Sequence, residues 1–258
     1  LDSFAGALGR ERLDYSGEPP EAIRESGYGE ERMARQVAEI DAFTQEKVRL
    51  SSLARDSYFA KLDTSSLEAF KNTVEPYRDD FREKVTGDWN LGLQAPDPRS
   101  RKVCESDNWI GYEVVLDVFE NVFATGFLLV PRNLDRTRRN PAIVCQHGLG
   151  GNPRVLFDNS SEAYHNLASV LADRGYVVFT PQNLTIGSMG DEFRTLQRKS
   201  WLMGRTIFAI MVPQHEQIVR WLGSLAFVDP DRIAFYGLSY GGKTAMRVPA
   251  LVKGYALS

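Results

Sequence analysis

Short apolar runs that alternate with amphipathic stretches dominate the second half of this 258-residue chain. The runs at 142–145, 176–179 and 232–236 lack the polar alternation of a half-exposed strand, so each is predicted to be a strand buried on both faces. Apolar residues at helical spacing occupy the two intervals, at 161–173 and 207–225. This order predicts a mostly parallel sheet with helices on both faces, and therefore an α/β fold.

A β-hairpin is predicted immediately before the first of these runs. Residues 112–119 and 122–130 have strand periodicity and are separated by a two-residue turn. The proline-containing stretch 88–101 is predicted to be a linker, with its basic run 99–102 as a solvated face. We therefore expect the α/β core to occupy residues 102–258.

Residues 1–101 are predicted to form a helical extension and linker that pack on this core. Residues 1–30 contain many glycines and prolines and predict a loosely packed arm, whereas 31–86 have helical periodicity. Ser65, with Glu68 three residues later, predicts a capping box at the start of a second long helix. The apolar stripe of that helix is expected to pack on the core. It comprises Leu67, Phe70, Val74, Tyr77, Phe81 and Val85.

Composition limits the classes of partner. With 31 Lys and Arg against 34 Asp and Glu, the chain has a net charge of −3, and we expect no nucleic-acid partner. No apolar run approaches the roughly 18 residues of a membrane span, so no membrane partner is expected. Cys104 and Cys145 form at most one disulfide and lack metal-ligand spacing. The chain starts at Leu1, so a removed leader and the compartment stay open, as does the oligomeric state.

The sequence Gly237-Leu238-Ser239-Tyr240-Gly241 matches the Gly-x-Ser-x-Gly pattern of a nucleophile elbow. A buried strand is predicted directly before it and a helix directly after it, which is the structural setting that the motif requires. The flanking glycines permit the sharp, strained turn that exposes the serine hydroxyl. Ser239 is therefore the candidate nucleophile, at a helix N-terminus that favours negative charge.

A glycine-rich run, His147-Gly148-Leu149-Gly150-Gly151, follows the first parallel strand. Glycines there would allow backbone N–H groups to approach a substrate oxygen closely. The alternative is a tight turn after a strand and nothing more. The serine motif in the matching topological position favours the first interpretation.

Residues from about 141 to 251 resemble the α/β-hydrolase superfamily, in its branch similar to dienelactone hydrolases and acetyl xylan esterases. The resemblance depends on the His-Gly-x-Gly-Gly run, the segments 174–178 and 228–233, and the serine motif. It implies a Ser/His/acid triad that hydrolyses an ester without metal or organic cofactor. It also implies that Tyr240 and Leu149 supply the oxyanion-hole amides, and that the substrate is a small-molecule or carbohydrate ester.

One departure from this superfamily is plain. Its triad has the chain order nucleophile, acid, histidine, yet no Asp, Glu or His follows Ser239. We therefore expect a core that is incomplete at its C-terminus, with the acid and the base beyond residue 258. A non-catalytic relative is the less favoured explanation.

The three histidines of the chain are weak candidates for the base. His147 is expected to fix the geometry of the glycine-rich loop. His165 and His215 are predicted to lie on the two crossover helices, where histidines are more often surface or satisfied groups.

Other polar residues near the motif have simpler explanations than catalysis. Asp229 and Asp231 flank Pro230 in a predicted turn. Lys243 could form a Ser-Lys pair, but a supporting or surface role is favoured. Two rival functions stay open: a serine peptidase similar to prolyl oligopeptidase, and a non-catalytic binding module with the same core.

Overall fold

The computed structural model describes the chain except residues 1, 10–20, 22–27 and 185–189. It divides into two compact units, Leu1–Thr64 and Ser65–Ser258. The second unit thus contains the helices that begin near residue 65, which we assigned to the N-terminal extension. Packing of the whole extension on the core stays a prediction.

The first unit contains two helices, α1 (Asp2–Ala7) and α2 (Tyr28–Tyr58). The helical prediction from residue 31 is confirmed by α2, whereas α1 lies within the segment predicted to be an arm; most of that segment is outside the described residues. Charged pairs one turn apart, such as Glu46 with Arg49, line α2. Among the described helices, none combines the length and apolar character that a membrane crossing requires.

The second unit begins with three short helices, where the sequence predicted one. They are α3 (Leu67–Thr73), α4 (Glu75–Phe81) and the π-helical turn η1 (Arg82–Thr86). Pro76 stands in the first turn of α4, where its missing N–H is tolerated, but a helix continuing through it would lose a hydrogen bond.

The cap and the apolar stripe of this segment differ in detail from the prediction. The N-cap of α3 is Ser66 and not Ser65, because the Ser66 hydroxyl accepts the Ala69 N–H at 3.0 Å. Phe81 packs against the core as expected, whereas Leu67 and Val85 are exposed. The stripe therefore anchors the segment through part of its length only.

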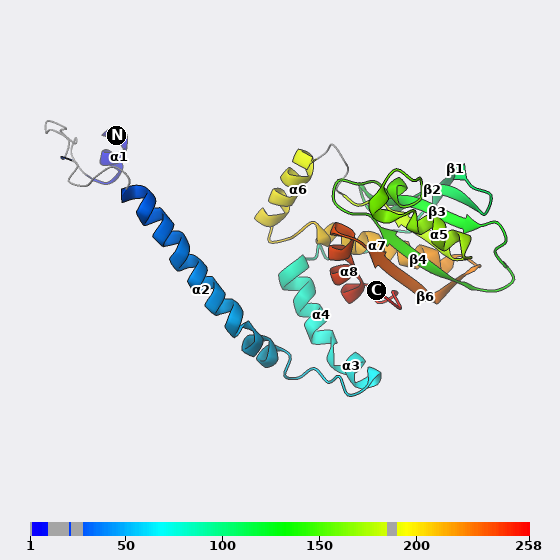
Figure 1. The fold of residues 1–258 in the computed structure, drawn as a ribbon, viewed down its shortest axis with the longest axis horizontal. Coiled ribbons are helices and arrows are strands. Elements are labelled where there is room, and N and C mark those ends of the chain that lie inside the picture. The colour runs from blue at the N-terminus through cyan, green and yellow to red at the C-terminus, as the bar shows by residue number, and fades with distance from the viewer. Residues whose placement is uncertain (1, 10–20, 22–27, 185–189) are drawn as a thin grey trace. The chain divides into compact units, whose positions relative to one another are not determined.

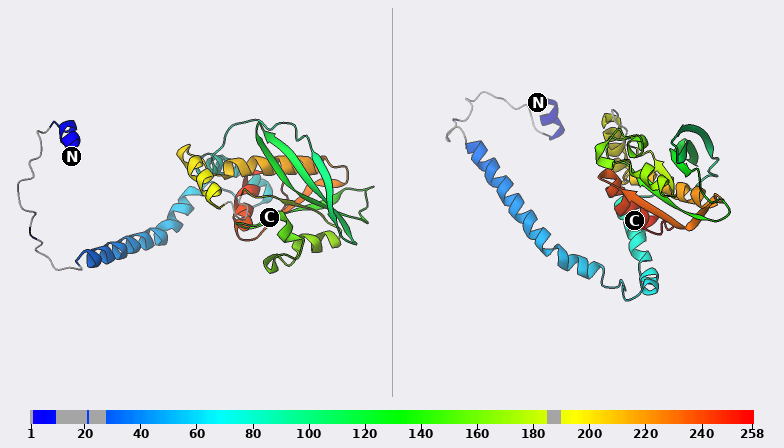
Figure 2. Two further views of the ribbon diagram at one scale, coloured as in Figure 1. Left: turned by 90° about the horizontal axis from the view of Figure 1, so that it is seen from above. Right: turned by 45° about the vertical axis from the view of Figure 1, so that its right-hand side comes forward.

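The core of the second unit is a six-stranded mixed sheet in the order β1-β2-β3-β5-β4-β6 (Figures 1 and 2). β4 pairs in parallel with β5 and with β6, while β1, β2 and β3 are antiparallel to their neighbours. The predicted hairpin is confirmed by β2 and β3, and the first two buried strands by β4 and β5. The third predicted strand is present as β6, but it is an edge strand with Arg232 and Tyr236 exposed, so its burial on both faces was wrongly predicted. The bounds are β1 Arg99–Glu105, β2 Trp109–Phe119, β3 Val122–Pro131, β4 Asn140–Gln146, β5 Val177–Pro181 and β6 Val228–Gly237.

Different helices cover the two faces of this sheet (Figure 1). Leu128 of β3 packs in the cluster that contains α7 (Phe208–Ser224) and α8 (Tyr240–Leu251). Its neighbour Leu129 points to the other face and packs in the cluster that contains α5 (Leu167–Asp173). Burial on both faces explains why these strands lack polar alternation.

Two elements beside the sheet differ from the prediction. The first crossover helix is predicted from residue 161, but the structure has 3-10 turns at η2 (Pro153–Leu156) and η3 (Glu162–Tyr164), and α5 starts only at Leu167. A further helix, α6 (Gly190–Leu202), precedes α7 and is absent from the prediction.

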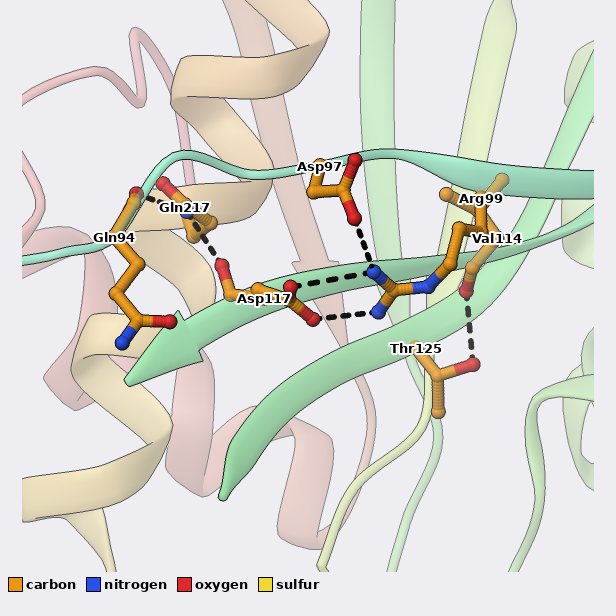
Figure 3. Close-up of polar contacts among 7 residues, drawn as sticks. All are labelled: Gln94, Asp97, Arg99, Val114, Asp117, Thr125 and Gln217. Atoms are coloured by element: carbon orange, nitrogen blue, oxygen red, sulfur yellow. Dashed lines mark hydrogen bonds and ion pairs between the residues drawn. The ribbon is translucent and has the colours of Figure 1, made fainter. Parts of the chain in front are cut away.

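The predicted linker ends in a strand. Arg99 to Lys102 belong to the edge strand β1, which pairs antiparallel with β2. Figure 3 shows Arg99 between two carboxylates, 2.7 Å from Asp97 and 2.5 Å from Asp117. The basic run is therefore solvated as expected, but it forms part of the sheet and is neutralised by acidic neighbours on β2, on β1 itself and just before β1.

The irregular residues before β1 are held against the sheet by α7. The buried Gln217 side chain donates to the Gln94 carbonyl at 2.9 Å and to the Asp117 carbonyl at 2.5 Å (Figure 3). One side chain thus joins α7, β2 and the segment that leads into β1.

Candidate active site

Ser239 lies in the two-residue connection between β6 and α8, with a backbone conformation that non-glycine residues avoid. Its φ is 59° and its ψ is −118°, and it occupies the N-cap position of α8 without using its side chain as a cap. The residue is exposed. The predicted sharp, strained turn is therefore confirmed, and the hydroxyl is free of local hydrogen bonds to the helix.

Two glycines make this turn possible by close backbone approach. A Cβ on Gly237 would lie 2.0 Å from the Gly241 carbonyl oxygen, and a Cβ on Gly241 would lie 2.2 Å from the Gln146 carbonyl oxygen. Backbone atoms cannot move aside as a flexible side chain can, so both positions require glycine. The second contact brings α8 against the end of β4.

The loop after β4 forms a tight turn whose first central residue is Leu149. The Gly151 N–H donates to the Gly148 carbonyl at 3.4 Å, and Gly150 has φ of 70°. A type II turn has its third residue, here Gly150, in the left-handed region. The N–H of its second residue, here Leu149, takes no part in the hydrogen bond that closes the turn. The role of the Leu149 N–H as an oxyanion donor stays a prediction.

Gly148 brings this turn against the elbow. A Cβ at Gly148 would lie 3.2 Å from the Ser239 Cβ and 2.8 Å from the Tyr164 hydroxyl oxygen. The Gly148 N–H donates to that hydroxyl at 2.7 Å. Parallel pairing places the ends of β4 and β6 at one edge of the sheet, so these groups from three segments share one site.

The electrostatic setting of Ser239 is that of a helix N-terminus. The Tyr240 N–H is one of the first-turn donors that an α-helix leaves without an intrahelical acceptor. The Tyr240 ring stacks on Phe208 and meets Phe193 edge-on, and burial raises the pKa of its hydroxyl to about 12. One candidate oxyanion donor, the Tyr240 N–H, thus belongs to the residue next to the exposed serine. The other, the Leu149 N–H, belongs to the turn that Gly148 brings against the elbow.

His147 is fully buried and its ring is committed to the loop. Its Nε2 accepts the Asn183 backbone N–H at 3.0 Å, and because a backbone N–H can only donate, the ring proton must be on Nδ1. That nitrogen is 2.8 Å from the Gly148 carbonyl oxygen. Burial lowers the pKa of His147, which keeps the ring neutral. His147 therefore ties the loop after β4 to the loop after β5, as predicted.

The other two histidines are not joined to Ser239 either. His165 is exposed and left-handed, with φ of 46°, and lies before α5 and not within the helix as predicted. His215 is buried in α7, where its Nδ1 is 2.8 Å from the Tyr255 hydroxyl and burial lowers its pKa to about 3. No hydrogen bond among the described residues links a histidine to the Ser239 hydroxyl.

The remaining sequence candidates have structural roles. Asp229 accepts the Asp231 N–H at 3.2 Å and pairs with Arg232 at 2.6 Å, at the opposite end of β6 from Ser239. Lys243 places its ammonium 5.2 Å from the centre of the Tyr240 ring. Cys104 and Cys145 are unbridged. In the described part of the chain, no three His, Cys, Asp or Glu side chains gather as a metal site would need.

Sequence comparison finds peptidase relatives for part of the chain. The model of the prolyl oligopeptidase family matches residues 161–250, which run from η3 through the elbow into α8. Dipeptidyl-peptidase 5 of Aspergillus oryzae is 26% identical over 164 residues, which are 60% of this chain and 21% of that protein. The chain thus spans about a fifth of the length of this curated relative.

Structural comparison finds esterases. A candidate acetyl xylan esterase from Bacteroides fragilis NCTC 9343 has a TM-score of 0.60 and 19% identity, covering 74% of this chain and 53% of that chain. The chain has the α/β-hydrolase fold. Methylesterase BT1017 is also similar, with a TM-score of 0.56 and 21% identity over 77% of this chain and 42% of that chain. Both similarities confirm the predicted fold.

One residue of this candidate site, Tyr164, is not predictable from the sequence. It approaches Gly148 through a 3-10 turn followed by two left-handed residues, His165 and Asn166. Asn166 is the local sequence feature that is typical of such a backbone bend, because asparagine tolerates the left-handed conformation better than most residues.

Proposed function

We propose that this chain carries the nucleophile and the oxyanion hole of a serine hydrolase that cleaves carboxylic esters, with a carbohydrate acyl ester as substrate. Ser239 is the nucleophile, and the N–H groups of Tyr240 and Leu149 bind the oxyanion. The observation that supports this most strongly is the exposed Ser239 in a strained turn at a helix N-terminus, beside the turn at residues 148–151. The similarity to a candidate acetyl xylan esterase favours the carbohydrate substrate.

The reaction follows from these positions. The Ser239 oxygen bonds to the ester carbonyl carbon, its proton passes to a general base, and the carbonyl π electrons move onto the oxygen, where the two N–H groups stabilise the charge. When that electron pair returns, the bond to the alcohol breaks and the alcohol takes the proton. Water then repeats the two steps on the acyl-enzyme and releases the acid.

The general base and its acidic partner are assigned to residues outside 1–258. His147 and His215 are buried with their Nε2 or Nδ1 engaged, and none of the three histidines is hydrogen-bonded to Ser239 among the described residues. Relatives of this chain are several times longer, which leaves room for further catalytic residues in the whole protein.

A peptidase is the second candidate function. The match to the prolyl oligopeptidase family and the dipeptidyl-peptidase relative favour it, and the nucleophile and oxyanion hole would serve an amide as well as an ester. A non-catalytic binding module is the third. Peptidase and esterase differ in the leaving group they can expel, so substrate preference separates them.

The test uses protein expressed from its complete coding sequence. We expect hydrolysis of p-nitrophenyl acetate and release of acetate from acetylated xylan oligosaccharides, with little cleavage of a dipeptidyl p-nitroanilide. Ser239→Ala should lower ester turnover by about 10³-fold or more while the protein stays folded. Full activity in Ser239→Ala would exclude Ser239 as nucleophile. Preference for the anilide would favour the peptidase, and a folded protein inactive on all three would favour the binding module.

A second measurement addresses the position of the base. Residues 1–258 expressed alone should retain only the slow turnover that oxyanion stabilisation and binding provide. If this chain hydrolyses the ester as fast as the complete protein, the base lies within residues 1–258 and our assignment is wrong.

A further inference from the structure

We propose that Tyr164 is a third catalytic group of this site, whose hydroxyl donates a hydrogen bond to the oxyanion formed on the acylating ester. This inference rests on the proposed function, since it needs Ser239 as the nucleophile. It assigns a role to a side chain that neither the serine motif nor the glycine-rich run contains.

The position of the hydroxyl is fixed by the glycine between Tyr164 and Ser239. The place where a Gly148 Cβ would stand is 2.8 Å from the Tyr164 oxygen and 3.2 Å from the Ser239 Cβ. The missing Cβ therefore leaves one small space bordered by the phenol and the nucleophile. Leu149, the candidate oxyanion donor, is the next residue along the chain.

The hydrogen-bonding capacity of the hydroxyl is only half used. A phenol donates one hydrogen bond and accepts others. The Tyr164 oxygen accepts the Gly148 N–H at 2.7 Å, which leaves its own O–H to donate. Within the described residues, no acceptor receives that proton. A donor that is held next to a nucleophile and lacks a protein acceptor is the arrangement that an oxyanion completes.

The Tyr164 side chain is held in place by a sharp bend of the backbone at residues 159–166. Asn159, His165 and Asn166 have φ values of 59°, 46° and 52°, all left-handed. The Asn159 N–H donates to the Asn166 side chain at 2.7 Å, and the two side-chain amides also bond to each other. The bend ends η3 at Tyr164 and delays α5 until Leu167. Left-handed residues cost energy and persist where the surroundings require them, which is common at functional sites.

The chemistry requires no proton transfer from Tyr164. As the Ser239 oxygen bonds to the carbonyl carbon, the π electrons move to the carbonyl oxygen, and the phenol O–H strengthens its hydrogen bond to that oxygen. When the alcohol leaves, the electrons return to the carbonyl and the bond weakens again. The phenol proton stays on Tyr164 throughout, and the serine proton follows the route of the proposed function.

The test compares Tyr164→Phe with Tyr176→Phe, each made in the protein expressed from its complete coding sequence. Tyr176 precedes β5 and stands at the opposite edge of the sheet from Ser239, so the same loss of a hydroxyl there should leave the kinetics unchanged. For Tyr164→Phe we expect kcat on p-nitrophenyl acetate to fall by about 10- to 100-fold with KM unchanged, because the lost bond forms in the transition state.

A boronic acid that forms a tetrahedral adduct with Ser239 separates catalysis from positioning. Affinity of Tyr164→Phe for phenylboronic acid should fall in parallel with kcat/KM, since the adduct resembles the oxyanion intermediate. If the Tyr164 hydroxyl makes no bond to the oxyanion and Leu149 keeps its place without it, kcat and boronate affinity stay at the wild-type values, whatever happens to the melting temperature or KM. That result would overturn the proposal.

A second variant covers the case in which Tyr164→Phe does not fold. Gly148→Ala places a methyl group 2.8 Å from the Tyr164 oxygen, so the hydroxyl must move without being removed. Its kcat should also fall, and an unchanged kcat would contradict the proposal. Ser239→Ala in the same assay tests the proposed function separately: if it stays active, the nucleophile assignment fails whatever Tyr164 does.

Discussion

The two halves of the candidate site, the elbow at residues 237–241 and the turn at residues 148–151, keep their shapes by different means. Packing fixes the elbow, where added Cβ atoms on Gly237 and Gly241 would overlap backbone at 2.0 and 2.2 Å. Past Gly148, local turn chemistry fixes the turn, because Gly150 has no atom within 4 Å of its Cβ position and Leu149 is 62% exposed. We therefore expect substitution of the elbow glycines to change folding most strongly, and loss of the Leu149 N–H to change catalysis.

The largest expected effect is on folding, at Gly241. Gly241→Ala should lower the free energy of unfolding by more than about 3 kcal/mol, because its methyl group would press α8 away from the end of β4. The matched control is Gly242→Ala, whose Cβ would meet the Gly237 carbonyl at an ordinary 3.4 Å and would gain helix propensity. Urea unfolding followed by circular dichroism measures both. Equal stability of Gly241→Ala and the wild type would refute the packing argument.

The next effect is on catalysis, at Leu149. Proline suits the second position of a type II turn and lacks an N–H, so Leu149→Pro removes the oxyanion donor while it keeps the turn. We expect kcat on p-nitrophenyl acetate to fall by about 10²- to 10³-fold, the usual effect of losing one such donor. Leu149→Ala retains the N–H and should keep near wild-type kcat. If both variants behave alike, the Leu149 N–H does not bind the oxyanion.

Acid should lower the stability of the fold next to the elbow, because His215 packs on the strand that leads into it. Its ring packs 5.4 Å from that of Phe235 in β6, and burial lowers its pKa to about 3. As pH falls below about 6.5, the unfolded chain binds the proton first, so stability is present above that pH and is lost toward pH 3. The loss should amount to a few kcal/mol. His215→Gln, which cannot titrate, should show a smaller loss in melting temperature over this range, whereas exposed His165→Gln should follow the wild type.

The smallest effect is expected at Gly150. Its φ of 70° disfavours a side chain, but no atom obstructs one, so Gly150→Ala should cost about 1 kcal/mol in stability. Gly150→Asn should cost less, because asparagine tolerates the left-handed region. Melting curves of the two variants measure the difference. A loss as large as that of Gly241→Ala would mean that packing also fixes the turn.

Much of the fold could be predicted because its central strands are apolar on both faces. The runs 142–145 and 176–179 permit little other than buried strands in a chain of this composition. The edge strand β1 was missed because its charged residues are typical of a loop, and an edge strand needs no buried face. The single long helix predicted at 67–85 was wrong because Pro76 outweighs the apolar periodicity around it.

Some residues of the site can be predicted from local sequence motifs, and one depends on contacts that are distant along the chain. The elbow at Ser239 and the turn at Leu149 depend on glycines at fixed spacing, so the sequence predicts both. The place of Tyr164 depends on the left-handed pair His165 and Asn166, and its contact with Gly148 spans 16 residues of chain. No periodicity encodes such a contact, and only the three-dimensional structure reveals it.

The charged edge strand β1 also has a consequence for how the protein behaves in solution. Arg99, Arg101 and Lys102 each pair with an acidic residue, so the basic charges of this rim of the sheet are neutralised, and most of its residues are exposed. A second molecule could add a strand there only by displacing these ion pairs and their water. β1 therefore protects against aggregation more than it contributes to stability, since exposed ion pairs stabilise a fold only slightly. High salt, by screening those charges, removes part of that protection.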